Sequence, residues 1–165
     1  MGIAFKGSDI IDIAVHIEKN GAAFYSSALA LVKDPDLTDC FTRLAEMERG
    51  HIDVFQELLD VCYEKSHASD PEDPAVCYLR AFARGHVFDE SEAGAAALAE
   101  LRTPEAILKK AIVAEKDSIA LYTGIKAFID DDTCGREKIN GVLADEMNHL
   151  AELSECLEKL TATAG

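Results

Sequence analysis

The sequence lacks several features that would assign it to other classes of protein. It has no run of about 18 apolar residues, so we expect no transmembrane helix. Charged residues interrupt the apolar pattern that follows residues 1–7, so we also expect no cleavable signal peptide. The five cysteines include no Cys-x-x-Cys pair, which disfavours a disulfide framework or a structural zinc site. These absences predict small core thiols in a cytoplasmic protein.

Positive charge is also scarce. The chain has 16 Lys and Arg residues against 31 Asp and Glu residues, which gives a formal net charge of −15. Nucleic acids and anionic membrane surfaces repel such a chain, so neither is an expected partner. The length of 165 residues and the hydrophobic fraction of 48% suit one domain, 1–165, with its own core.

Apolar residues recur at three- and four-residue steps in four long segments, which is the pattern of amphipathic helices. It predicts helices at about 8–33, 36–66, 104–130 and 133–161. Asp34-Pro35 separates the first two helices, and Thr103-Pro104 begins the third with a cap and a proline. The intervening segment, about 67–103, is long enough to cross the length of a bundle. This order predicts an all-α, ferritin-like antiparallel four-helix bundle with one long crossover between the second and third helices.

The two halves of the chain resemble each other. Four pairs of residues recur at a shift of 97 or 98: Glu18 and Glu115, Tyr25 and Tyr122, Glu48 and Glu146, and His51 and His149. Such repeated halves predict a bundle with a pseudo-twofold axis, in which residues near the axis come in matched pairs.

Six of these residues lie on apolar helix faces, where no Lys or Arg accompanies them. Burying an uncompensated carboxylate costs several kcal/mol, but two divalent cations would offset four such charges. A glutamate from each of two helices and a Glu-x-x-His motif from each of the other two form the di-iron carboxylate pattern. The predicted metal ligands are Glu18, Glu48, His51, Glu115, Glu146 and His149.

A single Glu-x-x-His motif is weak evidence for a metal site. Glu64 and His67 also match it, yet they fall about 160° around the helix from Glu48 and have no counterpart in the second half. We therefore interpret them as a surface pair.

The sequence leaves two interpretations open for each of three further residues. Tyr25 and Tyr122 are either core aromatics or hydroxyl groups that bond to metal-bound carboxylates and guard against stray radicals. Asp145 is either a surface residue or a carboxylate that accepts the free N–H of His51. The position that matches Asp145 in the other motif is Met47, so the second reading predicts two unequal metal sites.

The chain resembles the rubrerythrin-related branch of the ferritin-like superfamily over nearly its whole length. The resemblance rests on Ile17-Glu18-Lys19 with Tyr25, on residues 44–51, on Ala114-Glu115-Lys116 with Tyr122, on residues 145–149, and on the linker 78–82. It implies a non-haem di-iron centre that is oxidised by peroxide or oxygen and re-reduced by a separate donor, such as a rubredoxin-type protein. It also implies a homodimer.

The sequence departs from this family in two respects. It has no rubredoxin module, and Ser118 stands where rubrerythrins have an extra glutamate. The remaining set of six ligands is similar to that of bacterioferritin. Ser118 and its counterpart Gly21 bring no carboxylate. We therefore expect His51 and His149 to stay bound, and the iron positions to stay nearly the same, in both oxidation states. Such a site should discriminate little between oxygen and peroxide.

The residues and the resemblance together predict an oxidoreductase with two iron ions per chain, manganese or zinc being other candidates for the bound metal. It would reduce peroxide or oxygen. Two alternatives stay open: a ferritin-like ferroxidase that stores or hands on iron, and a metal-binding bundle without enzymatic activity.

Overall fold

The computed structural model describes residues 7–65, 77–78, 98, 100–101, 103–128 and 134–163. Within these residues the chain forms four long helices: α1 (Gly7–Ala28), α2 (Pro35–Lys65), α6 (Pro104–Phe128) and α7 (Cys134–Thr163). None of them combines the length and the hydropathy needed to cross a bilayer.

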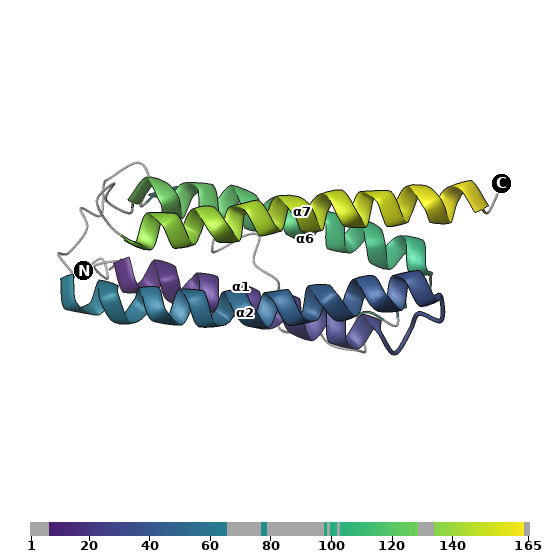
Figure 1. The fold of residues 1–165 in the computed structure, drawn as a ribbon, viewed down its shortest axis with the longest axis horizontal. Helices are drawn as coiled ribbons and strands as arrows, with labels where there is room; N and C mark the ends of the chain where they lie inside the picture. The colour runs from purple at the N-terminus through teal and green to yellow at the C-terminus, as the bar shows by residue number, and fades with distance from the viewer. Residues whose placement is uncertain are drawn as a thin grey trace.

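The helices are arranged as two antiparallel hairpins, α1 with α2 and α6 with α7 (Figure 1). The hairpins meet along α2 and α7 and along α1 and α6. The end of α2 and the start of α6 lie at opposite ends of the molecule, so their connection has to travel its length. The predicted four-helix bundle with one long crossover is confirmed. The predicted surface pair is not described, because the side chain of Glu64 and the whole of His67 fall outside the described parts of the chain.

Helix α1 is shorter than the prediction of 8–33, because it ends at Ala28 and residues 29–31 form a turn. At the start of α2, the Asp34 carboxylate accepts two backbone N–H groups of the first turn, at 3.0 and 3.1 Å. A capping residue has a non-helical backbone, and a residue that precedes proline disfavours the helical region. Asp34 therefore separates the two helices, and α1 itself closes earlier, where the Ala30 and Leu31 backbone N–H groups bond to carbonyl groups three residues back.

The start of α6 follows the prediction. The Thr103 hydroxyl accepts the backbone N–H of Ala106 at 3.1 Å, so threonine is the cap and Pro104 occupies the first helical position. The predicted boundary between the third and fourth helices, at 130–133, lies outside the described residues, and α7 continues to Thr163, two residues beyond the predicted end.

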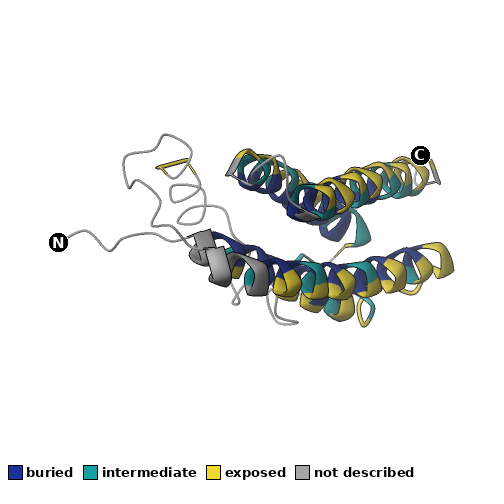
Figure 2. Cartoon of the chain, turned by 60° about the vertical axis from the view of Figure 1, so that its left-hand side comes forward, coloured by how far each residue is buried: buried dark blue, intermediate teal, exposed yellow. Residues whose placement is uncertain are grey.

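Apolar side chains fill two separate clusters between the hairpins, and the buried residues line the facing sides of both hairpins in Figure 2. The first cluster, near the α1–α2 turn, includes Phe24, Phe41, Leu44, Leu108 and Leu153. The second cluster, toward the opposite end, includes Ile11, Phe55, Leu121, Ile125 and Ile139. The polar site described below separates the two.

The cysteines do not all behave as predicted. Cys40 is a buried member of the first cluster, and Cys156 packs partly buried against it. Cys77 is exposed, so the expectation of core thiols was wrong for this residue. Its position in the connection between α2 and α6 removes it from both hydrophobic clusters. The side chains of Cys62 and Cys134 are not among those described.

Candidate metal centre

The six predicted ligands form a buried polar layer between the two apolar clusters. None of them is more than 5% exposed. Helices α1 and α6 contribute Glu18 and Glu115, while α2 and α7 each contribute a Glu-x-x-His pair. Among the residues described, no Lys or Arg is buried with them. Four carboxylates in one buried layer therefore require either protons or bound cations.

The donor atoms of these residues form two overlapping groups, in each of which all atoms lie within 4.8 Å of one another. The first group contains Glu18, Glu48, His51 and Glu146, and the second contains Glu48, Glu115, Glu146 and His149. Glu48 and Glu146 belong to both. Each hairpin therefore brings three residues to its own group and adds one shared carboxylate to the other.

Several buried polar atoms in this layer have no hydrogen-bond partner among the described residues. They are Glu115 Oε2, Glu146 Oε1 and both ring nitrogens of His149. The His149 Nδ1 atom lies 3.4 Å from Glu48 and 3.5 Å from Glu115, without the geometry of a hydrogen bond. Buried polar atoms are rarely left unpaired. The converging lone pairs fit cations, and a mixed carboxylate–imidazole set suits iron, manganese or zinc.

The two tyrosines connect the hairpins through this layer. Tyr25 of α1 donates its hydroxyl to Glu115 of α6, and Tyr122 of α6 donates to Glu18 of α1. Burial, together with the nearby carboxylates, raises the pKa of both tyrosines well above the usual value, so both stay protonated and act as donors. Of the two readings of the sequence, the structure supports the hydroxyl groups that bond to the carboxylates.

Asp145 lies beside His51. The ring of His51 presents Nδ1 to Glu146 at 3.1 Å and to Glu18 at 3.3 Å, while its Nε2 faces Asp145 Oδ2 at 3.4 Å. The Asp145 side chain is 44% exposed, so it is a surface residue that also reaches the imidazole. Such a carboxylate orients the ring of a metal-binding histidine.

His149 has no equivalent of this contact, since Met47 occupies the matching position. Its Nε2 atom lacks a hydrogen-bond partner within the described structure. The two histidine rings stack with centroids 5.6 Å apart, yet only one of them has a carboxylate behind it. The two halves of the site are therefore unequal.

The electrostatics of the layer favour bound protons when no cation is present. Burial raises the pKa of Glu48 and of Glu146 well above the usual range, and neighbouring carboxylates raise it further. Burial alone would lower the pKa of His51, but the adjacent carboxylates of Glu146 and Glu18 outweigh it and raise that pKa to about 10. Burial would raise the pKa of Glu115, but its interactions with His149, Glu146 and Tyr25 lower it.

Sequence reasoning missed one residue of the site. Gly21, one turn after Glu18, leaves the space that the Glu48 carboxylate fills, because a Cβ atom there would lie 2.7 Å from Glu48 Oε2. We expected only that Gly21 brings no ligand. The signal in the sequence was a glycine in a helix interior, where it costs about 1 kcal/mol relative to alanine.

The fold and the site together define a class, the ferritin-like four-helix bundle with a buried carboxylate–histidine cluster between its helices. One solved structure similar to this chain comes from Thermotoga maritima and is provisionally described as a ferritin-like diiron-carboxylate protein. The two have 25% sequence identity and a TM-score of 0.71 over 96% of this chain and 98% of that one. This likeness supports the ferritin-like di-iron family. No protein-family model and no curated protein sequence matches the chain.

Proposed function

We propose that this chain is a di-iron oxidoreductase that reduces peroxide or oxygen with electrons from a separate donor. The observation that supports it is the pair of overlapping donor groups that share Glu48 and Glu146. Two cations held through shared carboxylates are able to act together on one small molecule. The description of the Thermotoga maritima protein favours iron over other divalent metals.

Bound iron would supply the electron transfer by cycling between the ferrous and ferric states. The residues of the chain hold the ligands in place. The hydroxyls of Tyr122 and Tyr25 orient the carboxylates of Glu18 and Glu115, and Asp145 orients the ring of His51. The apolar clusters on either side limit access of bulk water to the layer. We also propose that the two tyrosines guard the site against stray radicals.

The donor and the assembly follow from the resemblance to rubrerythrins. No Cys-x-x-Cys knuckle occurs within the 165 residues, and the donor that we propose is a separate rubredoxin-type protein. A homodimer is the expected assembly. Mixing the protein with a reduced rubredoxin and peroxide, and following rubredoxin oxidation by absorbance, tests the donor directly.

The central experiment is metal analysis of protein purified without added metal, followed by anaerobic titration of the di-ferrous form. We expect two iron ions per chain and continued turnover when both a reductant and an oxidant are supplied. Iron content near zero after anaerobic loading would refute the metal assignment. Stoichiometric iron without sustained turnover would refute the oxidoreductase and leave the binding site intact.

A ferroxidase that stores or hands on iron is the second candidate, and Ser118 favours it. Ser118 is buried one turn after Glu115, where its short hydroxyl brings no extra carboxylate to the six-ligand set. A large iron-loaded particle on a sizing column would support this function. Stopped-flow oxidation of the di-ferrous protein by oxygen and by peroxide should give comparable rates, whereas Ser118→Glu should increase the preference for peroxide.

A further inference from the structure

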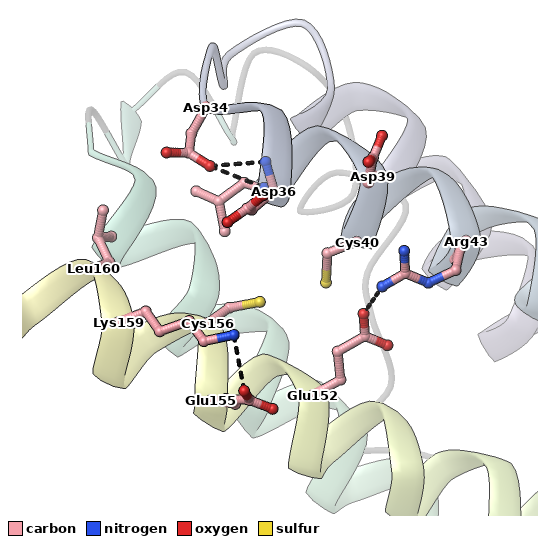
Figure 3. A pocket seen from close by; sticks show the side chains of 11 residues that line it. Asp34, Asp36, Asp39, Cys40, Arg43, Glu152, Glu155, Cys156, Lys159 and Leu160 are labelled. Atoms are coloured by element: carbon pink, nitrogen blue, oxygen red, sulfur yellow. Dashed lines mark hydrogen bonds and ion pairs between the residues drawn. The ribbon is translucent and has the colours of Figure 1, made fainter.

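A second group of reactive side chains lies away from the metal centre, in a pocket between α2 and α7 (Figure 3). The pocket has a volume of about 670 Å³ and is lined by both Cys40 and Cys156. Two ion pairs lie on its walls, one between Arg43 and Glu152 and one between Lys159 and Glu155. None of these residues belongs to the metal-binding layer.

The two thiols face each other across the pocket. The same antiparallel register that brings His51 of α2 beside Glu146 of α7 places Cys40 opposite Cys156. Their sulfur atoms point toward each other in Figure 3, and each Cys side chain lines the same pocket. A disulfide requires such facing side chains on neighbouring backbone segments.

The two cysteines differ in access. Cys40 is 1% exposed and belongs to the first apolar cluster, whereas Cys156 is partly exposed. A small molecule in the pocket therefore reaches the more exposed Cys156 more readily than the buried Cys40. This is the arrangement of an attacking thiol and a resolving thiol.

We propose that Cys40 and Cys156 form a reversible intramolecular disulfide when hydrogen peroxide oxidises the pair. The Cys156 thiolate attacks one peroxide oxygen, the O–O bond breaks, and hydroxide leaves while Cys156 becomes a sulfenic acid. The Cys40 sulfur then attacks the Cys156 sulfur, the S–O bond breaks, and the proton of Cys40 leaves with the hydroxyl group as water. Each peroxide is reduced by two electrons and two thiols become one disulfide.

The order of these steps agrees with the environment of Cys40. Burial, with a further contribution from Cys156, raises the pKa of the Cys40 thiol to about 12, so its thiolate is scarce and its direct reaction with peroxide is slow. The second step is intramolecular and needs no diffusing partner, which compensates for the low thiolate fraction.

The charge of the pocket restricts which molecules react there. Five acidic and two basic side chains line it, so its net charge is negative. Neutral hydrogen peroxide enters without an electrostatic penalty, whereas an anionic thiol such as glutathione is disfavoured. Reduction by a neutral dithiol at the accessible Cys156 sulfur would release Cys40 and restore the pair.

Peptide mapping tests the proposal sharply, because trypsin places the five cysteines in five different peptides. The full-length protein is treated with stoichiometric peroxide, alkylated and digested. We expect peptide 34–43 linked to peptide 139–159, at a mass two hydrogens below their sum, and loss of this species after dithiothreitol. Repeating the reaction with excess chelator should give the same product, which separates this chemistry from that of the proposed iron centre.

Three variants complete the test, each checked for folding by circular dichroism. Cys77→Ser, the control for an exposed cysteine outside the pocket, should form the linked peptide as the wild type does. Cys40→Ser should accumulate a sulfenic acid at Cys156 that dimedone traps. Cys156→Ser should keep Cys40 reduced. Because Cys156 is only partly buried, this variant remains informative even if Cys40→Ser impairs folding. Absence of the linked peptide, linkage only in iron-loaded protein, or unchanged oxidation of Cys40 in Cys156→Ser would each overturn the proposal.

Discussion

At the scale of single residues, Gly21 decides where the Glu48 carboxylate lies. We predict that Gly21→Ala weakens metal binding at both groups, because Glu48 belongs to both and its Oε2 lies only 2.7 Å from the new Cβ position. The clash involves the end of a flexible side chain, so the fold should tolerate it, and alanine adds up to about 1 kcal/mol of helix propensity. Chelator competition should show at least about a tenfold loss of affinity without a lower melting temperature of the metal-free protein.

The matched control for this substitution is Gly141→Ala. A Cβ atom at Gly141 meets nothing within 4 Å, so this variant gains the same helix propensity without touching a ligand. Its metal affinity should equal that of the wild type. Equal affinities in both variants would show that Glu48 adjusts without consequence for the site.

Asp145 permits a second prediction at this scale. Asp145→Asn removes the charge behind His51 Nε2 while keeping the size of the side chain. Outer carboxylates of this kind contribute about 10- to 100-fold to metal affinity. We therefore expect weaker binding of the metal in the group that contains His51, and little change in the affinity of the group that contains His149. Isothermal titration with a divalent cation should resolve the two steps. Asp53→Asn, at an exposed acid of α2, is the control and should change neither step.

At the scale of helices, the shared carboxylates come from α2 and α7, and the unshared ones come from α1 and α6. Glu48→Gln and Glu146→Gln should therefore lower the occupancy of both metals. Glu18→Gln and Glu115→Gln should each affect mainly one. Metal analysis of the four variants after identical loading would measure this, and equal losses in all four would contradict the assignment of shared ligands.

The sequence predicted these helices and their polar layer well, because charged residues on an apolar face stand out at helical spacing. It failed at the end of α1, where Leu29 and Val32 continue the apolar period but hydrogen bonds to carbonyl groups three residues back close the helix after Ala28. Gly21 and the pairing of Cys40 with Cys156 were not predictable, since both depend on which residues of neighbouring helices face each other. The spacing of apolar residues identifies the buried face of a helix. Which residues of two neighbouring helices face each other is seen only in the structure.

At the scale of the whole molecule, the metals would join the two hairpins by offsetting four buried negative charges. Removing them should lower the melting temperature, since a ligand that binds only the folded state stabilises it. Calorimetry of verified metal-free and reloaded protein measures the difference. Superimposable melting curves would show that the cluster has no effect on stability.

The metal-free protein should also become less stable as pH rises. The pKa of His51 is about 10 in the folded chain against 6.5 for an unperturbed histidine, so between these values the unfolded chain has lost a proton that the folded chain keeps. The free energy of unfolding then falls by up to about 1.4 kcal/mol per pH unit for this group. The raised pKa values of Glu48 and Glu146 act in the same direction above an unperturbed value of 4.5.

The lowered pKa of Glu115 does not oppose this trend above about pH 6.5, because that carboxyl is ionised there in both states. Urea unfolding in excess chelator at about pH 6.5 and about pH 8.5 would measure the slope. Metal binding should displace the same protons, so titrating metal into weakly buffered protein should acidify the solution. A metal-free protein that is more stable at the higher pH would contradict the assigned protonation.

The division of the ligands between the hairpins has a consequence for how the site is completed. Each hairpin provides three residues of one donor group and depends on the other hairpin for the fourth. The repeat between the halves gives the chain the form of two joined copies of a two-helix unit. A separate hairpin would complete its site only by meeting a second copy, at a rate set by concentration. The connection between α2 and α6 makes that encounter intramolecular, so that completion of the site no longer depends on how much protein the cell makes.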